Sequence, residues 1–361
     1  MPDLTYDVCI IGNGPAGLSA AITLASANLK VALFADDKKQ SLNLGETLHP
    51  TALDSIRKLG LSSQFKSLDF PKITGFESSW GNTLPRFRSA MQMPAGAGWL
   101  FLRNEFETMM QEEFLLRHGH LFTNPFDIKQ DEQWELSFHH KGERITLKSG
   151  FIIAATGRKK VMGLPTKSKQ ILDKLICYSL LMPTSDLDMT VKVDAIEDGW
   201  LYSARNYVGS RVVSLFTDGD IFKEKNHSSI VTYLSKLIPK ASAIGEIVNI
   251  IPGDLSNSTV ICSANTTYLE KASGDNWLVC GDCAQTYDPL SSQGITHALS
   301  SGIEAAQTAL AYLSGSKEAL ELYELTRGTR FREYLGQRTA YYNLEQRWPL
   351  SKFWRRRIDK N

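Results

Sequence analysis

Asp7-Val8-Cys9-Ile10-Ile11-Gly12-Asn13-Gly14-Pro15-Ala16-Gly17 is the stretch that decides the fold of this chain. Its apolar half is typical of a buried parallel strand, and the alanine-rich residues that follow predict a helix over 15–27. Gly12 permits a tight turn, Gly14 lets the backbone approach a pyrophosphate, and Gly17 allows close helix–strand contact. Free N–H groups at the helix start favour a phosphate. The stretch therefore predicts a dinucleotide-binding turn.

A second strand is predicted at Lys30-Val31-Ala32-Leu33-Phe34, which completes a strand–helix–strand unit. In such units an acidic residue at the end of the second strand contacts the adenosine ribose. Ala35 occupies the expected position and Asp36 follows it. We therefore expect Asp36 to contact the ribose.

The composition excludes several classes of partner. Of 361 residues 42% are hydrophobic and 22% charged, as in an ordinary soluble globular protein. The net charge is only +1, so no general field attracts nucleic acid or an anionic membrane. The first strand begins by about Tyr6, which leaves no room for a signal peptide, and no apolar run approaches the ~18–20 residues that cross a bilayer. We expect a cytoplasmic protein without a nucleic-acid or membrane partner.

The cysteine pattern favours reduced thiols. Five cysteines are dispersed along the chain, an odd number that does not suit a disulfide framework. Cys280-Gly281-Asp282-Cys283 has the spacing of a metal or redox motif, but a structural zinc site needs two further ligands. The sequence contains no second such motif and no paired-histidine motif with ligand spacing. We therefore predict no metal site.

Further turns are predicted to meet the dinucleotide. The segment Gly45-Glu46-Thr47-Leu48-His49-Pro50 follows the first unit by one connection, and Arg103 opens a helix. The continuous apolar run 151–155 predicts a buried parallel strand that ends in Thr156-Gly157. Near the other end of the chain a strand enters Gly281-Asp282, and a proline loop then leads to a helix over 295–313. Helix-initiating glycine turns at both ends of the chain can converge on one extended cofactor.

Together these motifs resemble the FAD-dependent aromatic hydroxylase superfamily, over most of the first 313 residues. The shared motifs are Gly12-x-Gly14-x-x-Gly17, Arg103 at a helix start, Thr156-Gly157 after an apolar strand, and Gly281-Asp282 followed by Asp288-Pro289-Leu290-Ser291-Ser292-Gln293-Gly294. The Gly-Glu-Thr-x-x-Pro turn and the Asp-Pro-Leu loop are similar to the branch that contains tryptophan halogenases and geranylgeranyl reductases. The resemblance implies that FAD is the cofactor.

The resemblance also implies a role for each motif. The first glycine turn and Asp36 hold the ADP half, Arg103 reaches the ribityl-phosphate side, and Asp282 binds the ribityl chain. The loop 289–295 with its helix N-terminus faces the isoalloxazine. The implied cofactor-binding residues are Gly12, Gly14, Pro15, Ala16, Gly17, Asp36, Glu46, Thr47, Arg103, Thr156, Gly157, Gly281, Asp282, Pro289, Gln293, Gly294 and Ile295.

The predicted fold class is α/β. We expect a Rossmann-like FAD-binding domain, with a parallel sheet, helices and an extra β-meander, interleaved with a mainly antiparallel β-sheet substrate domain and followed by a C-terminal helical segment. Alternating patterns at 134–139 and 144–148, with Gly142 between them, predict the meander. The expected boundaries are 1–70, 102–170 and 255–315 for the FAD-binding domain, 71–101 and 171–254 for the substrate domain, and 316–361 for the helical segment.

Two departures from the resemblance bear on the chemistry. Halogenases carry a glutamate after the Pro-Leu of the loop, where this chain has Ser291, and their Trp-x-Trp-x-Ile-Pro signature is absent from the comparable stretch 199–203. Lys72 could stand near the halogenase lysine. Thr156-Gly157 replaces the Asp-Gly of NADPH-using hydroxylases, so we expect an external reductant or a flavin reductase to supply electrons.

The short length, the Gly-Glu-Thr turn and the ending Tyr341-Tyr342-x-x-Glu345-x-Arg347-Trp348 are similar to the flavoprotein maturases of lysine ε-oxidase and glycine oxidase. Those proteins install oxygen on a precursor's tryptophan, which becomes cysteine tryptophylquinone. The resemblance implies a flavin-dependent monooxygenase whose substrate is a precursor oxidase protein. The alternatives are a small-molecule aromatic hydroxylase, a halogenase, a geranylgeranyl-reductase-like enzyme and a non-enzymatic flavoprotein.

The candidate catalytic residues are His49, Lys72 and His297, as groups that could move a proton, although a structural role is open for each. The tail 348–357 combines tryptophans with three arginines. We expect an amphipathic cap with packed aromatics and solvated arginines, and it is a candidate for part of a docking rim.

Overall fold

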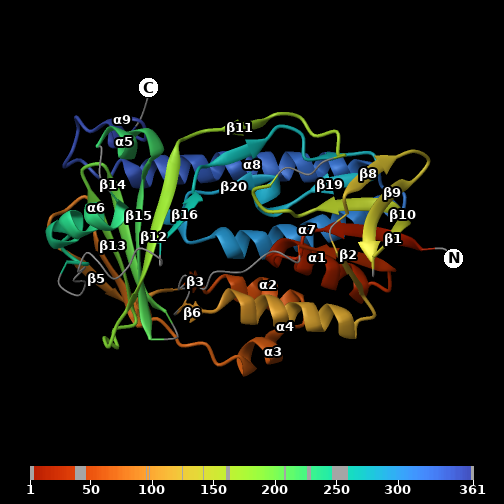
Figure 1. Cartoon of the computed structure of the whole chain (residues 1–361), viewed down its shortest axis with the longest axis horizontal. Helices are drawn as coiled ribbons and strands as arrows, with labels where there is room; N and C mark the ends of the chain where they lie inside the picture. The colour runs from red at the N-terminus through yellow and green to blue at the C-terminus, as the bar shows by residue number, and fades with distance from the viewer. Residues whose placement is uncertain are drawn as a thin grey trace.

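The computed structural model describes residues 4–36, 46–94, 96, 98–123, 125–140, 142–159, 163–206, 209–225, 229–245 and 259–358. Two large sheets stand at opposite ends of an elongated molecule, and the helices α7 (Gly294–Leu313) and α8 (Glu318–Tyr342) run between them (Figure 1). Within these ranges no helix is long and apolar enough to cross a membrane.

The sheet near the N-terminus is the predicted nucleotide-binding layer. Its path is β18-β19-β10-β1-β2-β7, and the meander β8 and β9 is attached through β10. The pairs β1–β10, β1–β2, β2–β7 and β10–β19 are parallel, so their carboxyl ends share one edge. The bounds are β1 Thr5–Ile11, β2 Val31–Ala35, β7 His120–Thr123, β8 Asp127–Gln130, β9 Trp134–His140, β10 Glu143–Ala154, β18 Ser273–Gly274 and β19 Trp277–Val279.

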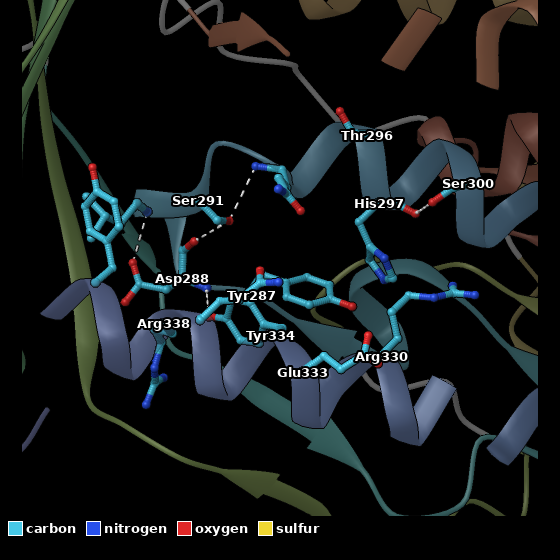
Figure 2. Close-up of a pocket in the computed structure, with 14 residues that line it drawn as sticks. Tyr287, Asp288, Ser291, Thr296, His297, Ser300, Arg330, Glu333, Tyr334 and Arg338 are labelled. Atoms are coloured by element: carbon cyan, nitrogen blue, oxygen red, sulfur yellow. Dashed lines mark hydrogen bonds between the residues drawn. The ribbon is translucent and has the colours of Figure 1, made fainter. Parts of the chain in front are cut away.

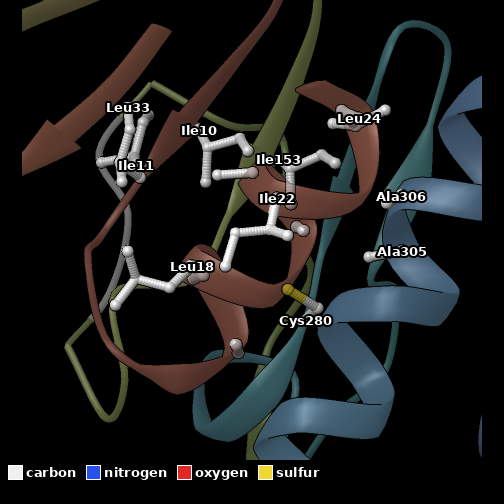
Figure 3. Close-up of a cluster of buried hydrophobic side chains, with 14 of the residues drawn as sticks. Ile10, Ile11, Leu18, Ile22, Leu24, Leu33, Ile153, Cys280, Ala305 and Ala306 are labelled. Carbon is white, nitrogen blue, oxygen red and sulfur yellow. The ribbon is translucent and has the colours of Figure 1, made fainter. Parts of the chain in front are cut away.

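Helix α1 (Pro15–Ser26) is packed between this sheet and α7 (Figure 3). Ile10, Ile22 and Ile153 are fully buried there, and each such side chain contributes about 1.5–3 kcal/mol through removal from water. A Cβ added at Gly302 would lie 2.1 Å from the Ala16 carbonyl oxygen. The two helices therefore approach so closely that only glycine fits at their contact.

The second sheet has seven strands in the order β16-β12-β15-β14-β13-β4-β5, all antiparallel except the pair β13–β4. Its bounds are β4 Gly75–Ser79, β5 Arg86–Ser89, β12 Leu175–Pro183, β13 Thr190–Ile196, β14 Gly199–Asn206, β15 Ser210–Asp218 and β16 Thr259–Ser263. The predicted α/β class with a mainly antiparallel second sheet is confirmed. Strand β16 falls in the stretch 255–315 yet pairs with β12, and the domain boundaries stay a prediction.

Two small sheets lie outside these layers. One pairs β3 (Glu46–Leu48) with β6 (Trp99–Phe101), and the other joins β11 (Lys169–Ile171), β17 (Thr267–Leu269) and β20 (Gln285–Thr286). The remaining α-helices are α2 Ala52–Lys58, α3 Ser62–Ser67, α4 Arg103–Leu116, α5 Gly219–Glu224, α6 Ile230–Leu237 and α9 Lys352–Arg355.

The C-terminal tail is part of the core of the second sheet. Trp354 is fully buried and donates its indole N–H to the Ile196 carbonyl at 2.9 Å. Arg357 is only 6% exposed, pairs with Asp218 at 2.6 Å and covers the Phe353 ring at 3.7 Å. The expectation of solvated arginines is therefore wrong for Arg357, because a buried carboxylate and two aromatic rings surround its guanidinium.

Candidate functional site

The turn after β1 has the shape that its glycines predict. Gly12 has φ +110°, and a Cβ there would lie 2.3 Å from the Ala155 carbonyl oxygen. A Cβ at Gly17 would lie 1.8 Å from the Gly12 carbonyl oxygen. Helix α1 begins at Pro15 after Gly14, and no side chain caps its start. Its N–H groups are thus available to a pyrophosphate, so the turn fits a dinucleotide cofactor.

A second glycine turn lies against the first. Gly281 has φ +61°, and a Cβ added to it would lie 2.8 Å from the Ala16 Cβ in α1. Its N–H donates to Ser301 Oγ on α7 at 3.1 Å. The turn after β10 lies beside it, since Thr156 Oγ1 is 3.3 Å from Cys283 Sγ. Segments from both ends and the middle of the chain therefore meet at α1, as the strand order requires.

A cluster of charged groups lies next to these turns. Arg103, the first residue of α4, donates to Glu107 at 2.7 Å and lies 3.5 Å from Glu46. Asp282 lies 3.7 Å from Arg158 Nε. Burial raises the pKa of the Asp282 carboxyl, while Arg158 and Arg103 oppose that shift. Such a cluster of charged groups suits the hydroxyl and phosphate groups of a cofactor's ribityl side.

Asp36 lies directly after β2, and its carboxylate accepts a hydrogen bond from Lys159 Nζ at 2.8 Å. Lys159 follows β10, so this contact spans the shared carboxyl edge of the sheet. Its role as ribose contact stays a prediction. Glu46 and Thr47 belong to β3, whereas Gly45 lies outside the described residues. Gly157 has φ +66°.

The three candidate catalytic residues contact different neighbours. His49 Nδ1 lies 2.8 Å from Thr51 Oγ1 and accepts the Thr51 N–H at 3.3 Å, just before α2. Burial lowers the pKa of His49. Lys72 forms a β-bridge with Trp99. Of the three, only His297 lines the cavity between α7 and α8, and the catalytic roles of all three stay predictions.

That cavity has a volume of about 540 Å³ (Figure 2). One wall is the segment between β20 and α7, which includes the loop expected to face the isoalloxazine, and the other is α8. Its lining residues are Tyr287, Asp288, Leu290, Ser291, Gln293, Thr296, His297, Ser300, Arg330, Glu333, Tyr334, Gln337, Arg338 and Tyr341. Leu290, Ser291 and Gln293 of this loop line the cavity, and α7 begins directly after Gln293. The contacts of the loop with the flavin stay a prediction.

Asp288 fixes the shape of the loop. Its buried carboxylate accepts the Leu290 N–H at 3.0 Å and the Tyr342 hydroxyl at 2.8 Å. Its own N–H donates to the Tyr334 hydroxyl at 2.6 Å. Burial raises the pKa of this carboxyl. Two tyrosines of α8, Tyr334 and Tyr342, thus hold the loop in place.

His297 projects from the first turn of α7 toward Tyr287 and α8 (Figure 2). The Tyr287 ring meets the imidazole edge-on, with centroids 4.4 Å apart. His297 Nε2 has no hydrogen-bond partner among the described residues. Burial, assisted by Arg330, lowers the pKa of His297 to about 3. The imidazole is therefore neutral near pH 7. Its Nε2 is buried, so it can accept a polar hydrogen from a ligand only if the side chain turns on binding.

Sequence reasoning named Tyr341 and Tyr342 only in the C-terminal resemblance, did not name Tyr334, and gave none of them a place at the cavity. Tyr334, Tyr341 and Tyr342 are spaced by seven and one, which places them on one helix face. That spacing could have indicated a shared surface. It could not have indicated that the surface faces Asp288, because the packing of α8 on the loop joins residues far apart in sequence.

Glycine turns that meet at α1, beside a cluster of charged groups at the carboxyl edge of a parallel sheet, define a dinucleotide-binding protein. The chain belongs to the FAD binding domain family, whose match spans residues 5–336. Its cofactor is accordingly FAD, and it is a flavin-dependent oxidoreductase of the halogenase- and hydroxylase-like superfamily.

One similar relative is the FAD-dependent oxidoreductase LodB of Marinomonas mediterranea, which is 27% identical over 364 residues, covering 98% of this chain and 97% of LodB. The myxobacterial chondrochloren halogenase CndH has a similar structure, with TM-score 0.85, 18% identity and coverage of 100% and 87%. The peptidyl tryptophan dihydroxylase QhpG gives TM-score 0.79, 17% identity and coverage of 98% and 78%. The two structural likenesses show a shared fold.

Proposed function

We propose that this chain is a flavin-dependent monooxygenase that oxygenates a tryptophan side chain of a precursor protein, during formation of cysteine tryptophylquinone in an amino-acid oxidase. The observation that carries the proposal is the neutral His297 in a cavity that Tyr287, Tyr334 and Tyr341 also line, beside the loop expected to face the flavin. An indole is a flat ring with one N–H donor, which matches that environment.

The comparisons support a protein substrate. The match to LodB extends over nearly the whole of both chains. QhpG is described as essential for tryptophylquinone cofactor biogenesis and acts on a peptidyl tryptophan. Its fold is shared by this chain, and we propose that the substrate class is shared as well.

The residues present fit FAD, as the two glycine turns and the charged cluster at Arg103 and Asp282 indicate. We propose that Gly12, Gly14 and α1 hold the pyrophosphate. Reduced FAD, when bound, supplies the activation of O2. The chain must position the ring and keep water away from it.

We propose that His297 orients the substrate ring by accepting its N–H, while Tyr287 and Tyr341 flank it as aromatic walls. Because the pKa of His297 is about 3, the acceptor is available throughout the physiological range. Ser291 cannot supply the carboxylate that the halogenase resemblance requires, and its hydroxyl donates instead to the Asp288 carbonyl at 2.9 Å. Ser291 therefore stabilises the conformation of the loop and does not act as an acid or base.

The test is co-expression with a precursor oxidase, followed by intact mass measurement of the precursor. The wild-type chain should add oxygen to it. His297→Phe keeps a ring of similar size but removes the acceptor, and should lower the oxygenated fraction about tenfold, the equivalent of one hydrogen bond. His297→Gln restores an acceptor and should recover part of the yield.

His140→Gln, an exposed histidine of β9, is the matched control and should leave the yield unchanged. FAD absorbance of each purified variant shows whether the cofactor is retained. No added oxygen with the wild-type chain, despite bound FAD, would contradict the proposed function. Rapid oxygenation of free phenols or indoles without the precursor would instead favour a small-molecule hydroxylase.

A further inference from the structure

Two cysteines face each other across neighbouring strands of the second sheet. Cys177 in β12 and Cys262 in β16 are directly opposite in the antiparallel register. The Ala264 N–H donates to the Leu175 carbonyl at 3.0 Å, which continues the same ladder next to them. Opposed residues of antiparallel strands have Cα atoms about 4.5–5.5 Å apart, within the range that a disulfide spans.

The two thiols differ in exposure. Cys177 is buried, and its Sγ lies 3.3 Å from Ser179 Oγ, which is 2.7 Å from Ser214 Oγ. Cys262 is exposed on the terminal strand of the sheet. The other cysteines, Cys9, Cys280 and Cys283, are buried. Cys262 is therefore the thiol that a dissolved oxidant meets first.

The surroundings also activate Cys262. A hydrogen bond from the Cys177 thiol lowers the pKa of Cys262 to about 7, with a further contribution from Arg158 that outweighs Glu46. The thiolate is the nucleophilic form of cysteine, so an appreciable part of Cys262 is reactive near neutral pH. The same hydrogen bond and burial raise the pKa of Cys177, which keeps that thiol protonated as the donor.

We propose that Cys177 and Cys262 are a redox-active pair that hydrogen peroxide converts into a cross-strand disulfide. In the first step the Cys262 thiolate attacks peroxide, the O–O bond breaks, and a sulfenic acid forms with release of hydroxide. In the second step the Cys177 sulfur attacks the Cys262 sulfur, the S–O bond breaks, and water leaves with the Cys177 proton. Peroxide gains the two electrons that the two thiols lose.

The position of the pair links it to the enzyme. Cys177 packs in the same cluster as Phe216, Trp200 and Leu290, so it lies on the sheet face that meets the loop at the cavity. Arg158, which helps to lower the pKa of Cys262, also pairs with Asp282 in the charged cluster next to the glycine turns. A disulfide would thus tie the terminal strand to the sheet beside the site. The assignment does not depend on the proposed substrate, because peroxide itself is the probe.

The experiment treats the reduced, FAD-loaded full chain with hydrogen peroxide and maps its peptides by mass spectrometry without reduction. We expect loss of two thiols, a peptide linking Cys177 to Cys262, and full reversal by dithiothreitol. Cys9 and Cys280 should remain reduced in the same sample as internal controls. Alkylation of Cys262 by iodoacetamide should rise with pH, with its midpoint near pH 7.

Cys262→Ser should abolish the link and leave Cys177 reduced, and this exposed position does not disturb the core. Cys177→Ser should leave Cys262 to stop at the sulfenic or sulfinic acid. A pair that stays reduced under peroxide that oxidises glutathione would overturn the proposal. So would oxidation of wild-type Cys262 without any link to Cys177.

Discussion

Protonation of His297 makes the free energy of unfolding depend on pH. Its ordinary pKa is 6.5, and burial lowers the value to about 3 in the folded chain. Between these values the unfolded chain binds a proton that the folded chain excludes, so stability falls as pH falls. The same burial that keeps a neutral acceptor in the cavity therefore costs stability in acid.

We expect the wild-type chain to lose about 2 kcal/mol more than His297→Phe when pH is lowered from 7 to 5, because the slope approaches about 1.4 kcal/mol per pH unit for one excluded proton. Chemical denaturation at both pH values measures the difference. Other acid-sensitive groups act equally in both proteins and cancel. Equal losses in the two proteins would mean that His297 titrates normally.

The short C-terminal helix α9 is packed into the second sheet and contributes to its stability. Its part in a docking surface stays a prediction. Its Trp354 and the adjoining Arg357 reach β13 and the end of β15, where Asp218 is 1% exposed. A carboxylate this deeply buried requires its partners. Tyr342 lies between the Arg357 guanidinium and Asp288, so the same packing extends to the loop at the cavity.

Arg357→Met should lower the free energy of unfolding by about 3 kcal/mol, since it leaves Asp218 buried with only Arg356 as a cationic partner. Arg355→Met, at an exposed position of the same helix, is the matched control and should change stability by less than about 0.5 kcal/mol. Denaturant titration of both variants checks this. Equal free energies of unfolding for Arg357→Met and Arg355→Met would indicate that the arginines of the tail are solvated, as first expected.

Arg158 and Lys159, which directly follow the Thr156-Gly157 turn, contact groups near the expected FAD site. Arg158 donates to the Asn265 carbonyl at 2.9 Å and lies beside Asp282, while Lys159 donates to Asp36. Arg158 and Lys159, the two described basic residues of this segment, are thus engaged with Asp282 and Asp36, which the resemblance assigns to the cofactor. This arrangement supports the proposal that electrons come from an external reductant.

Anaerobic NADPH alone should therefore bleach the flavin absorbance slowly and without saturation, whereas a flavin reductase with NADH should accelerate the bleaching at least about tenfold. Stopped-flow absorbance measures both rates. Fast reduction that saturates with NADPH would show a direct nicotinamide site and remove the need for a partner. Added FAD without the reductase controls for free flavin.

The main elements of the fold were accessible from local patterns. The buried parallel strands read as continuous apolar runs, and the glycine turn predicted both the start of α1 and the cofactor class. The helix expected over residues 295–313 is present as α7. The cofactor residues were named from motifs, and their contacts with FAD stay predictions.

The sequence by itself determined the α/β class, the family and FAD, because strand periodicity and glycine conformation are local properties that short motifs record. Only the tertiary structure decided which side chains meet. It buried Arg357, separated His49 and Lys72 from the cavity, placed α8 tyrosines on Asp288, and set Cys177 opposite Cys262. Such pairings depend on strand order and helix packing between distant segments, and no local pattern encodes them.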